Sequence, residues 1–313
     1  MRLERGFAAA AIGLPLLAAL LWAAYYIFVL AITPGTAPSA VFVYPFLLGG
    51  ALYTGWSLAD GHGAAMWRLW RDPAAYVRVA FLVGMQLAVL ASTYLAGPVD
   101  TSLLSLIGDV VLTPIVVGIW FTGYRGRIDT PLLWIGMALC TLGGGLAIVG
   151  GHGLTALRGA GYLVLIAIPL TVAFFFLATA RENERSPPSA VVAQSMLAAG
   201  LVGLVLTPLL PGGLGGLAVV DLVPLLVLLA TGATSFFVAP ALYFESIRRV
   251  GLVVPPMMMT GIPVFAALLS WGILGIAIPW IGIVGIPIAV AGAILALRGE
   301  TPSPTTASAT TSR

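Results

Sequence analysis

Residues 131–151 read PLLWIGMALCTLGGGLAIVGG and contain no charged side chain. About 20 consecutive apolar residues are enough for a helix to cross the hydrocarbon core of a bilayer, so this stretch predicts a membrane-spanning helix. The whole chain has the same character: 60% of its 313 residues are hydrophobic, 8% are charged, and the mean hydropathy is +1.08. Soluble domains carry about 25% charged residues. We therefore predict an all-α integral membrane protein.

Nine further apolar runs of similar length surround this one, and short connections rich in Gly, Pro or charge separate them. The first run is longer than the core of a typical signal peptide, so we expect it to be retained, although a cleaved signal is the alternative. Residues 299–313 are rich in Ser and Thr and are expected to form a disordered cytoplasmic tail. The ten predicted spans are 7–32, 38–59, 77–97, 101–122, 131–151, 160–180, 189–211, 222–244, 252–274 and 278–298.

The positions of the arginines support ten spans. All 14 basic residues are arginine, and with the N-terminus inside, the predicted outer loops contain only Arg158. Positive charge concentrates on the cytoplasmic side of membrane proteins, so we predict a multi-pass protein of the plasma (inner) membrane with both termini cytoplasmic. Trp67 and Trp70, beside two arginines, are typical of an interfacial anchor.

A weak internal repeat divides the spans into two groups of five. Tyr94 precedes Pro114 by 20 positions, Tyr243 precedes Pro263 by 20, and a Trp-Ile-Gly sequence opens the last helix of each group, at 134–136 and 280–282. Because five is an odd number, the two groups would have opposite orientations in the membrane, as in many transporters. We predict two inverted five-helix repeats, 1–151 and 152–298.

The same stretches resemble a known family. The first helix, LLAALLWAAYYIF (16–28), and the helix ends around TSLLSLIGDVVLTPIVVGIW and ALYFESIRRVGLVVPPMMMTGIPVFAALLSWGILG are similar to the EamA-like family of the drug/metabolite transporter superfamily. The resemblance implies a carrier of small organic molecules with a central cavity lined by the first, third, fourth, sixth, eighth and ninth spans. Many members carry a Glu after the fourth and ninth helices, and this chain has none there. The resemblance therefore supports the family's fold for this chain more strongly than it supports any particular coupling residue.

Asp109 is the main candidate functional residue. It lies nine residues after Asp100, which is about 13 Å into a core about 30 Å thick, where a charge costs at least ~2.5–3.5 kcal/mol. Facing a wet cavity would lower that cost, and the carboxyl group would then bind a proton or a cationic solute. Ser105 and Thr113 share its helix face. A protonated Asp109 that only packs, and hydroxyls that bond to their own helix, are the alternatives.

Other polar and aromatic residues within spans are candidates for substrate binding or translocation. Each has a structural alternative: an interhelical hydrogen bond for the amide, and core packing for the aromatic and Met side chains. Pro114 and Pro263 are expected to kink their helices, whereas Glu245 is expected to pair with Arg248 or Arg249. The remaining candidates are Gln86, Tyr94, Trp22, Tyr26, Thr234, Tyr243 and Met258.

Several function classes lack their sequence signatures. There is no GxxxxGK[ST] phosphate loop and no HExxH, GxSxG or CxxC motif, and a single cysteine with two histidines makes a metal centre unfavourable. We therefore expect no enzyme, cofactor, metal or nucleic-acid partner. We expect a secondary-active exporter or exchanger of metabolites, amino acids or drugs, in contact with membrane lipids, with protons as a second partner if Asp109 couples. A lipid-modifying enzyme, a scaffold subunit or a channel is the alternative.

Overall fold

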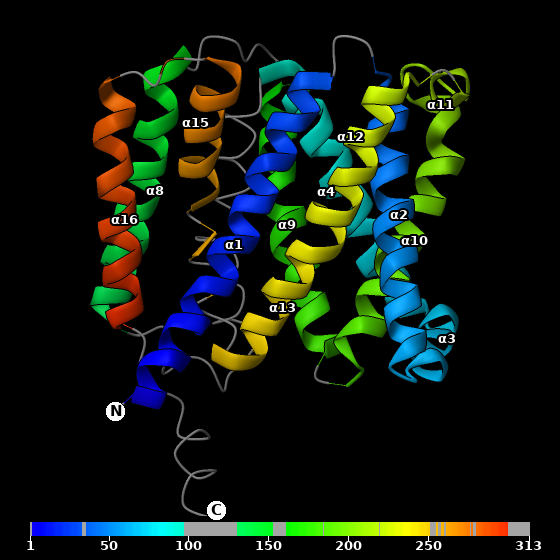
Figure 1. Ribbon diagram of the computed structural model, residues 1–313, viewed down its shortest axis with the longest axis horizontal. Helices are drawn as coiled ribbons and strands as arrows, with labels where there is room; N and C mark the ends of the chain where they lie inside the picture. Colours follow the sequence, from blue (N-terminus) through cyan, green and yellow to red (C-terminus); the bar gives the residue numbers. More distant parts are fainter. Residues whose placement is uncertain are drawn as a thin grey trace, which may run out of the picture.

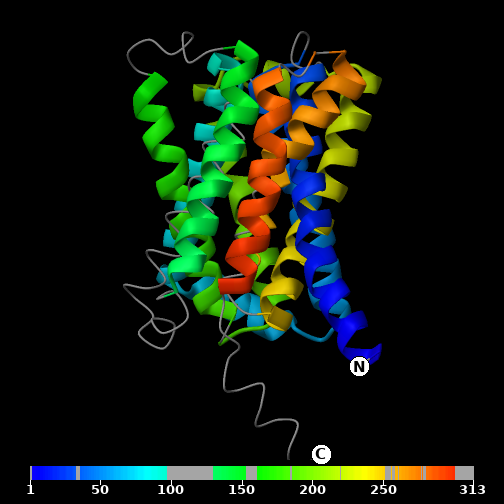
Figure 2. The same cartoon turned by 90° about the vertical axis from the view of Figure 1, so that its left-hand side faces the viewer.

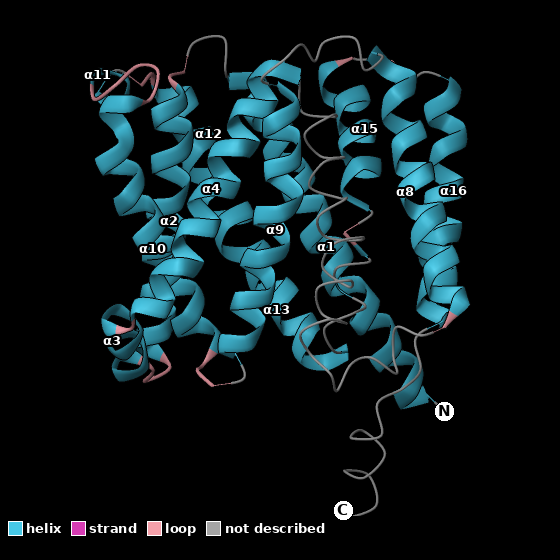
Figure 3. Cartoon of the chain, turned by 180° about the vertical axis from the view of Figure 1, so that it is seen from behind, coloured by secondary structure: helices cyan, strands magenta, loops and turns pink. Residues whose placement is uncertain are grey.

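The computed structural model describes residues 2–32, 36–96, 130–152, 161–183, 185–218, 220–250, 255, 258–259, 261–275, 277 and 280–299. Within these ranges the chain forms helices and connecting turns and no strand, and the long helices run roughly alongside one another as a bundle (Figure 1). Figure 2 shows the same bundle from the side, with α16 facing the viewer, and Figure 3 shows it from behind, with α8 and α16 at one edge.

The helix boundaries follow local sequence signals. Pro38, Pro73, Pro131 and Pro188 are each the first residue of a helix, a position where proline loses no hydrogen bond and its fixed φ favours helix entry. The helices are α1 (Arg2–Ile32), α2 (Pro38–Ala59), α3 (Gly63–Arg71), α4 (Pro73–Ala96), α8 (Pro131–His152), α9 (Gly161–Asn183), α10 (Pro188–Leu206), η4 (Thr207–Leu209), α11 (Gly215–Ala218), α12 (Leu222–Ala233), η5 (Thr234–Val238), α13 (Ala239–Val250), α15 (Gly261–Leu274) and α16 (Trp280–Gly299).

Nine of the ten predicted spans overlap helices of the described part, and 101–122 lies outside it, so the count of ten stays a prediction. Two features differ from expectation. The connection after α2 contains a helix, α3, because Met66 and Leu69 occupy one face of it and are buried. The eighth span contains the five-residue π-helix η5 between α12 and α13.

Four helices of the described residues are long and apolar enough to cross a membrane. They are Pro38–Ala59, Pro73–Ser92, Pro188–Leu209 and Leu222–Ile247. The arrangement in Figure 1 places α3, the start of α1 and the end of α16 at the same end of the bundle.

Helices that are far apart in the sequence pack side by side. α2 lies against α10, α4 against α9, α8 against α16, and α1 against both α13 and α15. Two hydrogen bonds fix the direction of the α2–α10 pair: Ser39 Oγ donates to Gly213 O at 3.2 Å at one end, and His62 Nδ1 lies 3.0 Å from Ser189 Oγ at the other. The two helices are therefore antiparallel.

Glycines allow these helices to approach closely. A Cβ added at Gly50 of α2 would lie 2.6 Å from Leu197 N of α10. Gly143 of α8 lies against the backbone of Ala289, and Gly292 of α16 against that of Cys140. Close packing at small residues is the usual way that membrane helices associate. Gly143 and Gly292 therefore allow α8 and α16 to approach closely.

Candidate functional site

A cavity of about 80 Å³ lies in the middle of the helix bundle. Its wall is drawn from α1, α4, α9, α10, α15 and the η5–α13 segment, and it is mostly apolar. The lining residues are Trp22, Tyr25, Tyr26, Leu82, Met85, Gln86, Val89, Val172, Phe175, Phe176, Met196, Ser235, Phe236, Pro240, Phe244 and Ile262. None of these described lining residues is charged, so the described part of the wall offers apolar surface, ring faces and single hydrogen-bonding groups.

Two reciprocal hydrogen bonds join α1 to the π-helix at the cavity wall. Trp22 Nε1 donates to Ser235 O at 2.9 Å, and Ser235 Oγ donates to Leu21 O at 2.8 Å. The indole N–H would otherwise be an unpaired donor in an apolar interior, which is costly. The turn of η5 therefore orients the Trp22 ring, and π-turns within α-helices occur frequently at functional sites.

Aromatic rings form much of the cavity wall and its support. The centroid of Trp22 lies 6.1 Å from that of Phe176 and 5.4 Å from that of Tyr243, and the latter two are 4.9 Å apart. On the other side, Tyr25 meets Phe236 edge-on at 5.2 Å. Tilted and edge-on pairs of this kind stabilise one another beyond their buried area, so the rings form a defined aromatic surface on the cavity wall.

Gln86 supplies a polar group within the cavity. Its amide Nε2 donates to the hydroxyl of Tyr25, which joins α4 to α1, and the Gln86 side chain is 2% exposed. A buried amide has more hydrogen-bonding capacity than this one bond uses. Gln86 therefore combines an interhelical bond with a place on the cavity wall, two roles that its sequence position had left as alternatives.

The predicted site residues divide into those that line the cavity, those that support it and those that are elsewhere. Trp22, Tyr26 and Gln86 line it. Tyr243 and Met258 are buried in the surrounding core, where Tyr243 packs against Trp22. Thr234 Oγ1 donates to Ala230 O of its own helix at 2.8 Å.

The other predicted residues cannot be placed in the cavity. Tyr94 lies on α4 near its end, outside the side chains that are described. Pro263 is the third residue of α15, in its first turn, where a proline removes no interior hydrogen bond. Ser105, Asp109, Thr113 and Pro114 lie outside the described residues, so their proposed roles rest on the sequence.

Sequence reasoning did not select several of the aromatic residues that line the cavity. Phe175 and Phe176 belong to the run Phe174–Phe176, and Phe174 instead stacks on Phe81 with centroids 5.2 Å apart. An aromatic triplet inside one span was the available signal. It could not identify the inward face, because α9 is hydrophobic on all sides and has no amphipathic pattern.

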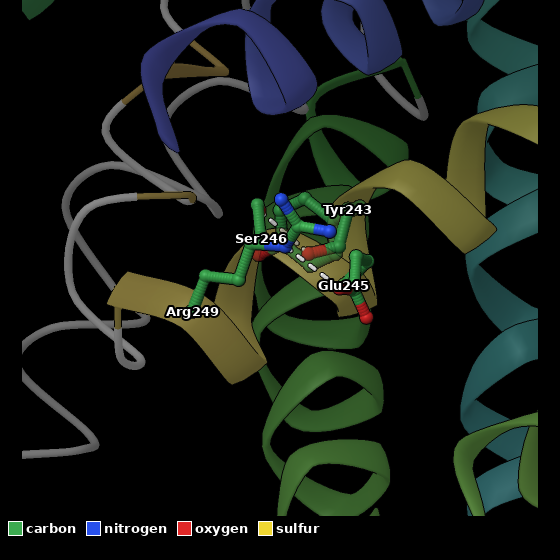
Figure 4. Close-up of polar contacts among 4 residues, drawn as sticks. All are labelled: Tyr243, Glu245, Ser246 and Arg249. Carbon is green, nitrogen blue, oxygen red and sulfur yellow. Dashed lines mark hydrogen bonds and ion pairs between the residues drawn. The ribbon is translucent and has the colours of Figure 1, made fainter. Parts of the chain in front are cut away.

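Glu245 forms an ion pair close to this site. Its Oε1 lies 2.7 Å from Arg249 Nε one turn along α13, which confirms the expected pairing with an arginine. Figure 4 shows this contact beside Ser246, whose Oγ donates to Tyr243 O at 2.7 Å. The two bonds lie on the part of α13 that continues from the cavity toward the end of the bundle that carries α3 (Figure 1).

A buried arginine joins α4 to α10 nearby. Arg78 is 3% exposed, and its Nε and Nη2 donate to Ser195 Oγ and Gln194 Oε1, each at 2.8 Å. A second arginine, Arg68 of α3, donates to Ser186 Oγ at 2.7 Å. These contacts tie α3 and α4 to the start of α10 and to the turn that precedes it.

Comparison with solved structures supports the fold. Fourteen chains of solved structures match the fold. One of them, described as "Crystal structure of protein", superposes with a TM-score of 0.74 at 20% identity, and the match covers 92% of this chain and 96% of that one. No curated protein matches the chain.

A family model matches the second half of the sequence. The match extends over residues 159–298, and the description of that model is the EamA-like transporter family. This range includes α9, α10 and the η5–α13 segment, which supply much of the cavity wall. The apolar helices and the family together indicate a membrane protein. Residues 159–298 are thus similar to the EamA-like transporter family, which is part of the drug/metabolite transporter superfamily.

Proposed function

We propose that this protein is a secondary carrier that moves a small organic solute with an apolar or aromatic portion through the central cavity. The family is one of transporters rather than enzymes. The observation that carries the proposal is the composition of the cavity wall: rings from Trp22, Tyr26 and Phe176 stand beside single hydrogen-bonding groups of Gln86 and Ser235. Such a wall suits aromatic or aliphatic metabolites, amino acids and drugs rather than sugars or nucleotides.

The size of the cavity favours a mechanism in which the helices move. Pockets that hold organic ligands measure about 300–1,000 Å³, whereas this one measures about 80 Å³. A solute would therefore enter only after helices around the cavity separate. A central site that opens to one side at a time is what alternating access requires, and export or exchange would follow from the direction of the solute gradient.

The pairing of the helices supports two inverted repeats, 1–151 and 152–298, as the moving units. If each predicted span corresponds to the span five positions later, the α2–α10 and α8–α16 pairs each join corresponding helices. The α4–α9 pair and the α1–α13 pair are then equivalent to each other. A two-fold relation between the halves would produce this pattern, and inverted repeats rock about a site at their interface in many transporters.

The distribution of arginines supports a cytoplasmic position for the end that carries α3. Arg68, Arg78 and Arg249 belong to helices or helix segments at that end, which also carries the start of α1. Cytoplasmic segments of membrane proteins are enriched in Lys and Arg. We propose a plasma-membrane protein with this end inside.

Asp109 remains the proposed proton-coupling residue on the strength of its sequence position. In the Asp109→Asn variant, transport driven by a pH gradient should be lost, while exchange of solute between the two sides persists. Flux measurements in proteoliposomes with and without a pH gradient would separate the two activities. If the variant still concentrates solute as the wild type does, Asp109 is not the coupling site.

The carrier proposal is tested by exchange of labelled solute in proteoliposomes. The wild type should exchange phenyl- or indole-bearing solutes and should not exchange sugars. The Trp22→Ala variant should lose most of this exchange, because it removes a ring from the cavity wall, whereas Trp280→Ala, at a residue 74% exposed on α16, should retain it. Exchange limited to sugars or nucleotides would refute the proposed solute class, and single-channel currents would refute a carrier.

A further inference from the structure

A second pocket, of about 400 Å³, lies between α2, the start of α10 and α13, toward the end of the bundle that carries α3. We call it the vestibule. Its volume falls within the range of about 300–1,000 Å³ that is usual for organic ligands, unlike that of the central cavity. Phe244 lines both the vestibule and the cavity, so the two pockets share this side chain as part of their walls.

The charges around the vestibule favour a cation. Its ionisable lining residues are Asp60, His62, Glu245 and Arg249. The Arg249 guanidinium lies 2.7 Å from the Glu245 carboxylate, so these two charges offset each other. With histidine counted as neutral at pH 7, the carboxylate of Asp60 gives the lining a net negative charge. An ammonium group is the natural partner for that carboxylate.

The vestibule also offers aromatic surface and an unused hydroxyl. Tyr53 and Trp56 stack with their centroids 5.7 Å apart and their planes at 23°. The Tyr53 side chain is 1% exposed, and its hydroxyl has no hydrogen-bond partner among the residues that the structure describes. A buried hydroxyl without a partner is costly. A ligand with a polar group at this depth would offset that cost.

The two polar anchors are Tyr53 of α2 and Asp60, the residue that caps the end of this helix. Tyr53 and Asp60 are seven residues apart, two helical turns, which separates them by about 10 Å along the axis. We propose that the vestibule is a binding site for a small aromatic amine that places its ammonium at Asp60, its ring beside Trp56 and a second polar group at the Tyr53 hydroxyl. Binding in the vestibule does not depend on the proposed carrier function. Only the further step, in which a molecule bound in the vestibule passes on to the cavity, rests on that function.

Tyramine and two relatives that each lack one of its polar groups test this arrangement. Phenethylamine lacks the phenol hydroxyl, and 4-ethylphenol lacks the ammonium. Equilibrium binding of tritiated tyramine to the purified full-length protein, with the other two as competitors, gives the affinity advantage that each group provides. We expect each advantage to be about fivefold, the upper end for an exposed ion pair and a typical value for one hydrogen bond.

Two variants assign each advantage to one residue. Asp60→Asn should abolish the advantage of tyramine over 4-ethylphenol and retain that over phenethylamine, while Tyr53→Phe should do the reverse. Asp72→Asn is the matched control, because Asp72 is a carboxylate at the same end of the bundle that does not line the vestibule. All three substitutions are nearly isosteric, and retained thermal stability checks that each variant is folded.

The outcomes separate this inference from the carrier proposal, because one is read from binding and the other from exchange across a membrane. Loss of each advantage in its own variant supports the vestibule site even if the protein transports none of the three compounds. The inference is overturned if wild-type protein does not bind tyramine. It is also overturned if either advantage persists in the variant that should remove it, or if Asp72→Asn removes the ammonium advantage equally.

Discussion

Three glycines of α2 provide a graded test of the packing that surrounds the cavity. A Cβ added at Gly50 would lie 2.6 Å from Leu197 N and 2.7 Å from its Cα. These are backbone atoms, so no side-chain rotation can relieve the clash. A Cβ at Gly49 would lie 2.8 Å from the Cβ of Phe236, a residue of the cavity wall. A Cβ at Gly55 would meet nothing within 4 Å.

The three Gly→Ala variants share one favourable term, because alanine is a better helix former than glycine by about 0.8–1 kcal/mol. Gly55→Ala should show that gain alone. Gly50→Ala and Gly49→Ala also incur the cost of overpacking, about 1–3 kcal/mol. Because the propensity gain cancels in the comparison, the difference in unfolding free energy from Gly55→Ala isolates the overpacking cost.

Thermal unfolding of the detergent-purified variants measures this difference. A difference of about 1–3 kcal/mol should separate the melting temperatures by roughly 2–6 °C. Solute binding should weaken further in Gly49→Ala than in Gly50→Ala, because the first displaces Phe236. If Gly50→Ala is as stable as Gly55→Ala, the close contact of α2 with α10 is wrong. The proposed pairing of the two halves then loses that support.

Three further substitutions test individual contacts. Trp22→Phe keeps an aromatic ring but loses the hydrogen bond to Ser235 O. In thermal unfolding it should lower the unfolding free energy by about 0.6–1.7 kcal/mol, and the control Trp280→Phe should leave that free energy unchanged. Arg78→Lys replaces a fork of two hydrogen bonds by one point charge and should lower stability by about 1.5–3 kcal/mol in denaturant titration. Phe244→Ala should join the vestibule to the cavity and speed the labelling of a cysteine at Val89 of the cavity wall by a thiol reagent applied from the vestibule side. Unchanged labelling would show that Phe244 does not separate the two spaces.

Much of the helical arrangement could be predicted because a bilayer allows few backbone conformations for a segment that crosses it. Uncharged runs such as 131–151 form helices in order to satisfy their own backbone groups, and α8 spans 131–152 as expected. The exception is α3, whose nine residues, Gly63–Arg71, were predicted to be part of a connection. Their amphipathic pattern is too short for a span, and only contact with the rest of the bundle buries Met66 and Leu69.

The site could be predicted only in part, for a related reason. Gln86 and Trp22 were identifiable because a polar amide and an indole N–H within a span need partners, and they have them in Tyr25 and Ser235. The side chain of Phe176 has no polar group that needs a hydrogen-bond partner. The sequence pattern is therefore the same whether this ring faces lipid or the cavity. The π-helix η5 was also not predicted from the sequence. It places the hydroxyl of Ser235 against Leu21 O, and this contact depends on how the segment packs against α1.

Accessibility of a single cysteine in the cavity tests the central claim most directly. The native Cys140 is buried between α8 and α16, and Cys140→Ala removes it. Val89→Cys then places a thiol on the cavity wall, at a position 4% exposed. A membrane-impermeant thiol reagent, applied separately to each side of oriented membranes, should label this cysteine from both sides. A transported aromatic solute should slow labelling from each side. Labelling from one side only, or from neither, would contradict a central site that opens alternately to the two sides of the membrane.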